Sequence, residues 1–105
     1  MSYIIWMEKY RTGLKEDDPV AWNVKTITEA RKIAYKAVSH TKGSLNEKGE
    51  YKANIYEQTY RGHGPEIFVG EVMNTVSNKR YWYPWSISAG KYELRPDGRT
   101  GKKLR

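Results

Sequence analysis

The sequence contains no cysteine, and this absence excludes a disulfide framework and any thiolate-based metal or catalytic site. No apolar run approaches the ~20 residues that span a bilayer, and the amino terminus lacks the charged-then-apolar layout of a signal peptide. From these absences we expect a cytoplasmic protein that contacts no membrane.

Aliphatic residues and phenylalanine are also scarce, since Leu, Ile, Val and Phe together make up only 18 of the 105 residues. So low a share in a highly charged chain is typical of disorder. Nine tyrosines and four tryptophans indicate the opposite, because each ring can bury about 150 to 250 Å². We therefore expect a folded chain with an aromatic-rich core.

The length of the chain fits one domain, which we place at residues 1–98, followed by a flexible basic tail at residues 99–105. The net charge of +7 comes from 19 Lys and Arg against 12 Asp and Glu, and it is concentrated near this tail. Residues 95–105 carry five of the cations and a single carboxylate, Asp97. A basic balance favours nucleic acid or an acidic protein surface as partner, although it also keeps a small protein in solution.

One helix is predicted by a capping box, Thr26-Ile27-Thr28-Glu29, in which the Thr26 hydroxyl and the Glu29 carboxylate each satisfy an orphaned backbone N–H. The residues that follow place apolar side chains on one face at helical spacing, and Gly43 is a plausible stop. The predicted apolar face consists of Ile27, Ala30, Ile33, Ala34, Ala37 and Val38.

Alternating apolar and polar residues predict strands over residues 2–11, 20–25, 51–60, 66–74, 80–88 and 91–94. Residues 66–76 also fit a second helix, but Gly70 and the density of β-branched residues favour a strand. Pro84 implies an edge position or a bulge. Together the elements predict an α+β fold in which one amphipathic helix packs on one face of a mainly antiparallel sheet of five or six strands.

The sequence carries no enzyme signature. Glycine patterns of the P-loop and dinucleotide types are absent, and the glycines of residues 61–65 are typical of a hairpin turn. His63 could carry a proton or contact a phosphate, but it has no orienting partner nearby. The two histidines and scattered carboxylates fit no usual metal-ligand spacing, and Glu16-Asp17-Asp18 is typical of a solvated turn. We expect a non-enzymatic protein with no cofactor, metal or small-molecule substrate.

One helix cannot cover both faces of such a sheet, so the other face should be wet or bound. Strand parity places Tyr56, Tyr60 and Trp82 on that face and turns Tyr83, Trp85 and Ile87 inward. Rings stack on bases at about 1 to 3 kcal/mol each, while neighbouring cations hold phosphates. Exposed tyrosines are also ordinary sheet formers, which is the alternative explanation. The candidate nucleic-acid-binding residues are Lys52, Tyr56, Tyr60, Arg61, Lys79, Arg80, Trp82, Arg99, Lys102, Lys103 and Arg105.

The first functional hypothesis is a binding module that holds nucleic acid through the aromatic and basic sheet face, assisted by the tail. The rival hypothesis is a small protein-binding regulator or inhibitor, of the kind that phages and mobile elements carry, which uses the same rings and arginines as interface anchors. The chain lacks the aromatic consensus of an RNA-recognition motif and the GXXG loop of the KH type. Lys and Arg around the exposed rings would favour nucleic acid, whereas an apolar or acidic rim would favour protein.

Overall fold

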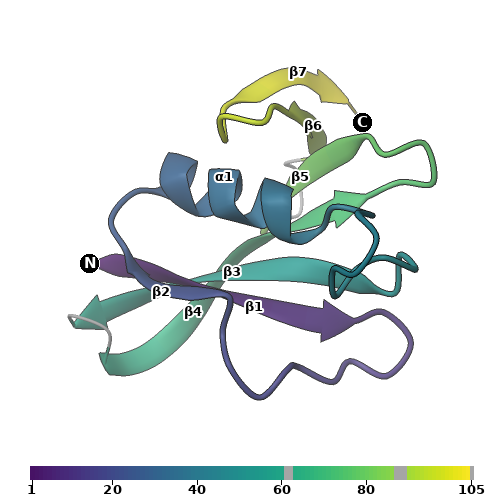
Figure 1. The fold of residues 1–105 in the computed structure, drawn as a ribbon. Helices are drawn as coiled ribbons and strands as arrows, with labels where there is room; N and C mark the ends of the chain where they lie inside the picture. Colours follow the sequence, from purple (N-terminus) through teal and green to yellow (C-terminus); the bar gives the residue numbers. More distant parts are fainter. Residues whose placement is uncertain (61–62, 87–89, 105) are drawn as a thin grey trace.

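The computed structural model describes residues 1–60, 63–86 and 90–104, without the side chains of Tyr60 and His63. Over these residues one helix lies on one face of a seven-stranded sheet whose pairings are all antiparallel (Figure 1), which is the predicted α+β arrangement. The elements are β1 (Ser2–Lys9), β2 (Ala21–Val24), α1 (Ile27–Ala37), β3 (Tyr51–Tyr60), β4 (His63–Asn74), β5 (Arg80–Pro84), β6 (Lys91–Leu94) and β7 (Thr100–Leu104).

The sheet differs from the prediction in its strand count, since we expected five or six strands and the described residues form seven. The additional strand is β7, which comes from residues that we assigned to a flexible tail. It pairs with β6, so that Leu104 lies opposite Lys91 and Thr100 opposite Leu94. The backbone N–H of Arg95 donates to the carbonyl of Arg99 at 2.9 Å and closes the hairpin. The cations of this segment therefore lie on a folded edge of the sheet.

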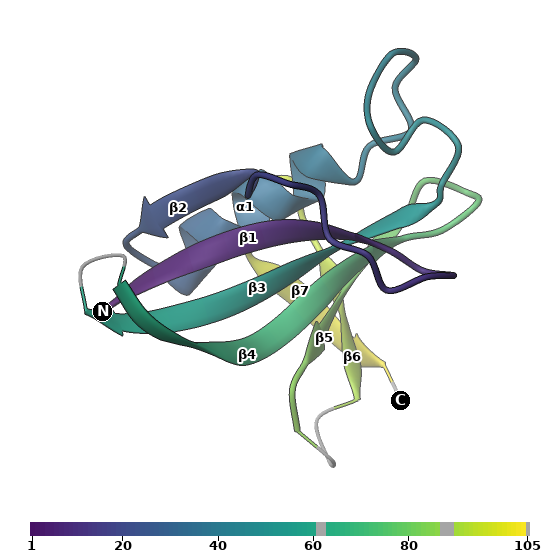
Figure 2. The same cartoon turned by 90° about the horizontal axis from the view of Figure 1, so that it is seen from below.

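The strand order is β2-β1-β3-β4-β5-β6-β7, and the sheet is strongly curved along this order. Figures 1 and 2 show β2, β1, β3 and β4 beneath α1, while β5, β6 and β7 rise beside the helix. The helix therefore packs into the hollow of the sheet. The opposite face of the sheet, which we call the open face, carries no helix among the described residues.

The core fills the space between α1 and the sheet. Alternate residues of the central strands point toward the helix because side chains along a strand alternate between faces. They meet the predicted apolar face of α1, whose Ala30, Ala34 and Val38 are fully buried. The fully buried strand residues in this core are Ile5, Met7, Ala53, Ile55 and Val72. The predicted amphipathic face is thus confirmed.

The helix starts where the capping box predicts and ends earlier than expected. The Thr26 hydroxyl accepts a hydrogen bond from the backbone N–H of Glu29 at 3.1 Å. At the other end, side chains of Asn46 and Asn74 donate to the carbonyl of Val38 at 2.8 and 2.7 Å. These two donors satisfy a carbonyl that a helix end leaves unpaired. Gly43 therefore does not terminate the helix, and that prediction is wrong.

The predicted exposure of Trp82 is also wrong, because its side chain is only 4% exposed. Trp82 lies opposite Val72 in the β4–β5 ladder, so both point toward α1. Its ring occupies the space above Gly70, where an added Cβ would come within 2.5 Å of the ring. Because Gly70 has no side chain, the Trp82 ring fits against β4, and this determines that Trp82, and not its neighbours in β5, points toward α1. The same parity turns Trp85 outward, where it is 73% exposed.

The segment for which we weighed strand against helix is a strand, since residues 66–74 lie within β4. β5 is shorter than the predicted segment 80–88 and ends at Pro84, beyond which the Trp85 N–H still donates to the Val69 carbonyl at 2.8 Å. Ile87, which we expected to point inward, lies outside the described residues.

Loss of the helix cap should destabilise the protein. Thr26→Ala removes the oxygen that accepts from the Glu29 N–H, and we expect a loss of about 1 kcal/mol in the free energy of unfolding. Urea denaturation followed by circular dichroism measures this change. The neighbouring exposed Lys25→Ala serves as control and should change the free energy by less than about 0.5 kcal/mol. Equal effects of the two substitutions would contradict the capping role.

The two tryptophans of the β5 segment should respond in opposite ways to truncation. Trp82→Ala opens a cavity in the core and should cost about 3 to 5 kcal/mol, whereas Trp85→Ala removes an exposed ring and should cost at most about 1 kcal/mol. Thermal and urea unfolding of both variants give the comparison. A stable Trp82→Ala protein would restore the outward orientation that we first predicted.

Candidate functional site

The predicted nucleic-acid-binding residues do not form one surface. Lys52 and Tyr56 lie on the open face, whereas Arg80 and Trp82 lie on the opposite side of the sheet against α1. Lys79 is exposed in the turn between β4 and β5. Arg61, Arg105 and the side chain of Tyr60 lie outside what the structure describes. The remaining predicted residues, Arg99, Lys102 and Lys103, are exposed on the β6–β7 hairpin.

The open face carries a cluster of rings, which we call the aromatic cluster and which consists of Trp6, Tyr56, Phe68 and Trp85. The Phe68 ring contacts both Tyr56 and Trp85, with centroids 5.4 and 5.7 Å apart. Of this cluster the sequence identified only Tyr56. Trp6, Phe68 and Trp85 were missed because their outward orientation follows from the strand register rather than from local composition.

Charged groups at the aromatic cluster already have partners within the protein. The Lys15 ammonium lies 4.4 Å from the centroid of the Tyr56 ring and 5.5 Å from that of Trp6, which are cation–π distances. The indole N–H of Trp6 donates to a Glu66 carboxylate oxygen at 2.7 Å. Among the described residues the cluster therefore has one cation and one carboxylate at its rings, and these do not form a basic rim.

Lys52 is likewise committed to carboxylates on the open face. Its ammonium lies 2.8 Å from the Glu71 carboxylate and 3.6 Å from that of Glu8. Burial alone would lower the pKa of Lys52, but the hydrogen bond and charge of Glu71, with those of Glu8, outweigh burial and raise it. Two carboxylates around one ammonium leave this part of the face without a free cation.

Two arginines serve as structural cations on the helix side. The Arg80 guanidinium lies 4.2 Å from the centroid of the Tyr35 ring and donates to the carbonyls of Tyr35 and Asn78. Arg31 lies 5.4 Å from the Trp82 ring centroid, and burial lowers the pKa of its guanidinium. Since Arg80 is 9% exposed, it packs in the protein and is not a contact for an external partner.

The β6–β7 hairpin is fixed to α1 through its turn. Gly98 has a φ of +88°, and a Cβ there would overlap the carbonyl oxygen of Thr28 and lie 2.8 Å from the backbone nitrogen of Lys32. The Arg31 guanidinium donates to the Gly98 carbonyl at 2.8 Å. A glycine is thus required both by the left-handed backbone and by the close approach to the helix. This contact holds the turn of the β6–β7 hairpin against α1.

The contact gathers exposed cations from two parts of the sequence into what we call the basic surface. Lys32 and Lys36 lie one turn apart on α1, and therefore on one face of the helix. The β6–β7 hairpin lies next to α1 (Figure 1) and carries four further exposed cations. Glu29, Glu93 and Asp97 are the carboxylates of the same elements. The basic surface extends over α1 and both faces of the hairpin, and it consists of Lys32, Lys36, Arg95, Arg99, Lys102 and Lys103.

These cations are weakly engaged within the protein. Arg99 approaches Asp97 at 3.9 Å, and both side chains are largely exposed, so this pair contributes little. The Lys103 ammonium lies 6.0 Å from the centroid of the Tyr92 ring, at the outer limit of a cation–π contact. The basic surface thus differs from the open face, where Lys15 is held by rings and Lys52 by carboxylates.

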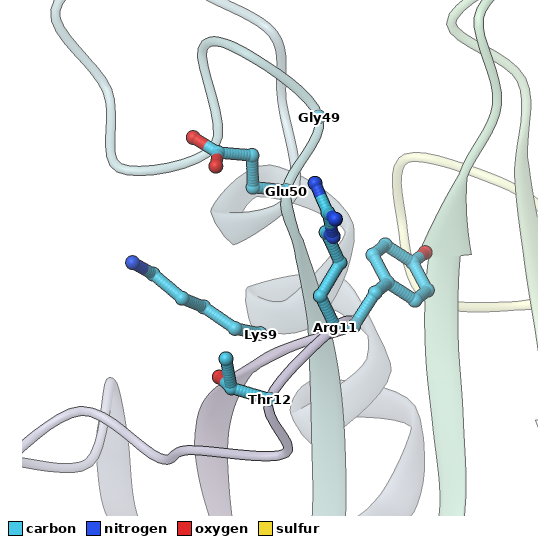
Figure 3. Close-up of a pocket in the computed structure, with 6 residues that line it drawn as sticks. Lys9, Arg11, Thr12, Gly49 and Glu50 are labelled. Carbon is cyan, nitrogen blue, oxygen red and sulfur yellow. The ribbon is translucent and has the colours of Figure 1, made fainter.

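A hollow of about 570 Å³ lies at the end of β1 and is lined by residues of both charges (Figure 3). Lys9 and Arg11 extend beside Glu50 there, so the site offers no uniform field to an ion. Among the described residues no three His, Asp or Glu side chains gather as metal ligands would. No helix in the described part of the chain is long and apolar enough to cross a membrane.

Tyr10, which also lines the hollow, should make stability depend on alkaline pH. Partial burial raises its pKa to about 12, and the charges of Glu71 and Tyr83 act in the same direction. Between pH 10 and 12 the unfolded chain loses this proton and the folded protein keeps it, so the free energy of unfolding falls as pH rises. Tyr10→Phe should show a shallower fall in urea denaturation over this range. Equal slopes for the two proteins would contradict the assignment.

Comparison with known proteins assigns this chain to no family. No protein-family model, no curated protein and no solved structure matches it at a significant level. The molecule offers two surfaces from which a function can be inferred, one aromatic with paired charges and the other basic with exposed cations.

Proposed function

We propose that this protein is a non-enzymatic nucleic-acid-binding module whose basic surface holds the phosphate backbone. The observation that carries the proposal is the gathering of six exposed cations on α1 and the β6–β7 hairpin, against three carboxylates on the same elements. Such a surface attracts a polyanion because each phosphate contact releases condensed counterions. The contact of Gly98 with α1 fixes the backbone of the hairpin that carries four of these cations, so less backbone entropy is lost on binding than with a flexible tail.

The proposal differs from the sequence-based hypothesis in the part of the molecule that it uses. Trp82 and Arg80 are buried on the helix side of the sheet, so they are not part of the proposed contact with nucleic acid. Lys52 is occupied by Glu71 and Glu8. Phosphate contacts therefore come from the hairpin and α1, and base stacking on Trp82 has no place in the proposed interface.

Neutralising the hairpin should weaken binding and reduce its salt dependence. We expect Arg99→Gln, Lys102→Gln and Lys103→Gln together to reduce the slope of log K against log salt by about 2 to 3, at roughly 0.9 for each lost phosphate contact. Fluorescence anisotropy with mixed-sequence DNA over a range of salt concentrations measures this slope. Substitution is preferable to deletion of residues 99–105, because deletion would remove β7 and disturb the fold.

A matched control keeps the net charge of the protein equal. Arg11→Gln, Lys42→Gln and Lys48→Gln remove one arginine and two lysines that are exposed away from the basic surface. This triple variant should keep a salt slope within about 1 of the original. Equal losses in the two triple variants would mean that net charge alone drives binding, and absence of binding at low salt would end the proposal.

A second candidate function is protein binding through the open face. The specific observation in its favour is the Trp85 ring, which is 73% exposed and packs on Phe68 beside charges that are already paired. Exposed aromatic anchors with few free cations are typical of protein interfaces. Under this alternative Trp85→Ala should leave nucleic acid binding unchanged and remove binding to a protein partner, whereas the hairpin substitutions should not affect that partner.

A further inference from the structure

The β6–β7 hairpin is a two-stranded ribbon at the edge of the sheet, and its cations lie on both of its faces. Lys103 lies opposite Tyr92, whereas a register shift places both Gly101 and Lys102 opposite Glu93. Because Tyr92 and Glu93 are consecutive in β6 and point to opposite faces, Lys102 and Lys103 lie on opposite faces of the ribbon. Both are exposed. The outer edge of β7 is unpaired within the described sheet, since β7 is the last strand in the order. A ligand that approaches this edge meets ammonium groups on either side of the strand.

The dimensions of such a ribbon match one groove of a nucleic acid. Neighbouring strands lie about 4.8 Å apart, and the major groove of B-form DNA, about 12 Å wide, admits a two-stranded ribbon. Cations on both faces of the ribbon would then reach the phosphates on both walls of the groove. The major groove of A-form RNA is too deep and narrow for this approach.

The position of the aromatic rings argues against a single strand as the ligand. Among the described residues the exposed rings are Trp85 in the aromatic cluster, Trp22 on β2 and Tyr10 after β1, and none of them lies on the β6–β7 hairpin or α1. Tyr92 beside Lys103 is half-buried. Tyr81 is also half-buried, and the Lys91 ammonium lies 4.8 Å from its ring centroid. Bases of a single strand would find no stacking platform on the basic surface, so a single strand would gain only phosphate contacts. A duplex offers these contacts at a higher charge density.

Building on the function proposed above, we propose that the preferred ligand is double-stranded B-form DNA, with the β6–β7 ribbon entering the major groove edge-on. Lys102 contacts phosphates on one wall of the groove and Lys103 contacts those on the other. Arg95, Arg99, Lys32 and Lys36 extend the contact along the adjacent backbone.

The first experiment compares ligands of the same sequence. Anisotropy titrations use a duplex DNA of roughly 20 base pairs, about two helical turns, with its single strand and the matching RNA duplex. Each phosphate contact contributes about 0.9 to the salt slope with duplex DNA and about 0.7 with a single strand. For six contacts this difference predicts about tenfold tighter binding of the duplex near 0.1 M salt. A single strand or an RNA duplex that binds as tightly would overturn the inference.

A second experiment tests the groove and the two faces of the ribbon. Bound protein should protect guanine N7, a major-groove atom, from dimethyl sulfate and leave adenine N3 in the minor groove reactive. Lys102→Gln and Lys103→Gln should each reduce the salt slope by about 1. Protection of adenine N3, or an effect of only one of the two lysines, would overturn groove entry.

The outcomes separate this inference from the proposed function. Salt-dependent binding that is equal for all three nucleic acids would retain the phosphate-binding function and remove the duplex preference. Absence of binding to every nucleic acid at low salt would remove both. Circular dichroism of each variant confirms that the lysine substitutions leave the fold unchanged.

Discussion

The architecture depends on the packing of the Trp82 ring above Gly70. This contact joins β5 to β4 on the helix side, and Arg31 of α1 lies over the same ring before it reaches the Gly98 carbonyl. One indole therefore connects the centre of the sheet, the helix and the hairpin turn. Without this contact the position of β5, β6 and β7 beside α1 would be less stable. The cations of the hairpin would then lie apart from those of the helix.

The same residue types fill two different roles in this protein. Arg31 and Arg80 stabilise the fold through rings and backbone carbonyls, and Lys52 neutralises two carboxylates on the open face. The cations of the basic surface have only weak internal partners, so their field extends into solvent. Net charge alone therefore misjudges where a polyanion can bind, because part of that charge is used internally.

The predictions from sequence succeeded where local chemistry decides the structure. Thr26 caps a helix whose apolar spacing matches its buried face, and the bounds of β3 and β6 agree with the alternation of their residues. The predictions were wrong where a residue on another strand determines which side chains are buried. Tyr81, Trp82 and Tyr83 are all aromatic, so either parity looks apolar, and only Gly70 on the neighbouring strand determines which ring is buried. The candidate site depended on the same parity, and for this reason its residues lie on both faces of the sheet.

The strand order also predicts the order in which the strands pair during folding. From β4 to β7 every strand pairs with the strand that precedes it along the chain, whereas β3 pairs with β1 across β2, α1 and a long loop. Pairing of distant segments costs more loop-closure entropy before it gains contacts. We expect the β3–β7 meander to order first and β1 to dock late with β2 and α1. Late docking of β1 would leave the apolar residues of β3 exposed to solvent in the meantime. Substitutions in β1 that slow its docking should therefore increase misfolding more than substitutions in the other strands.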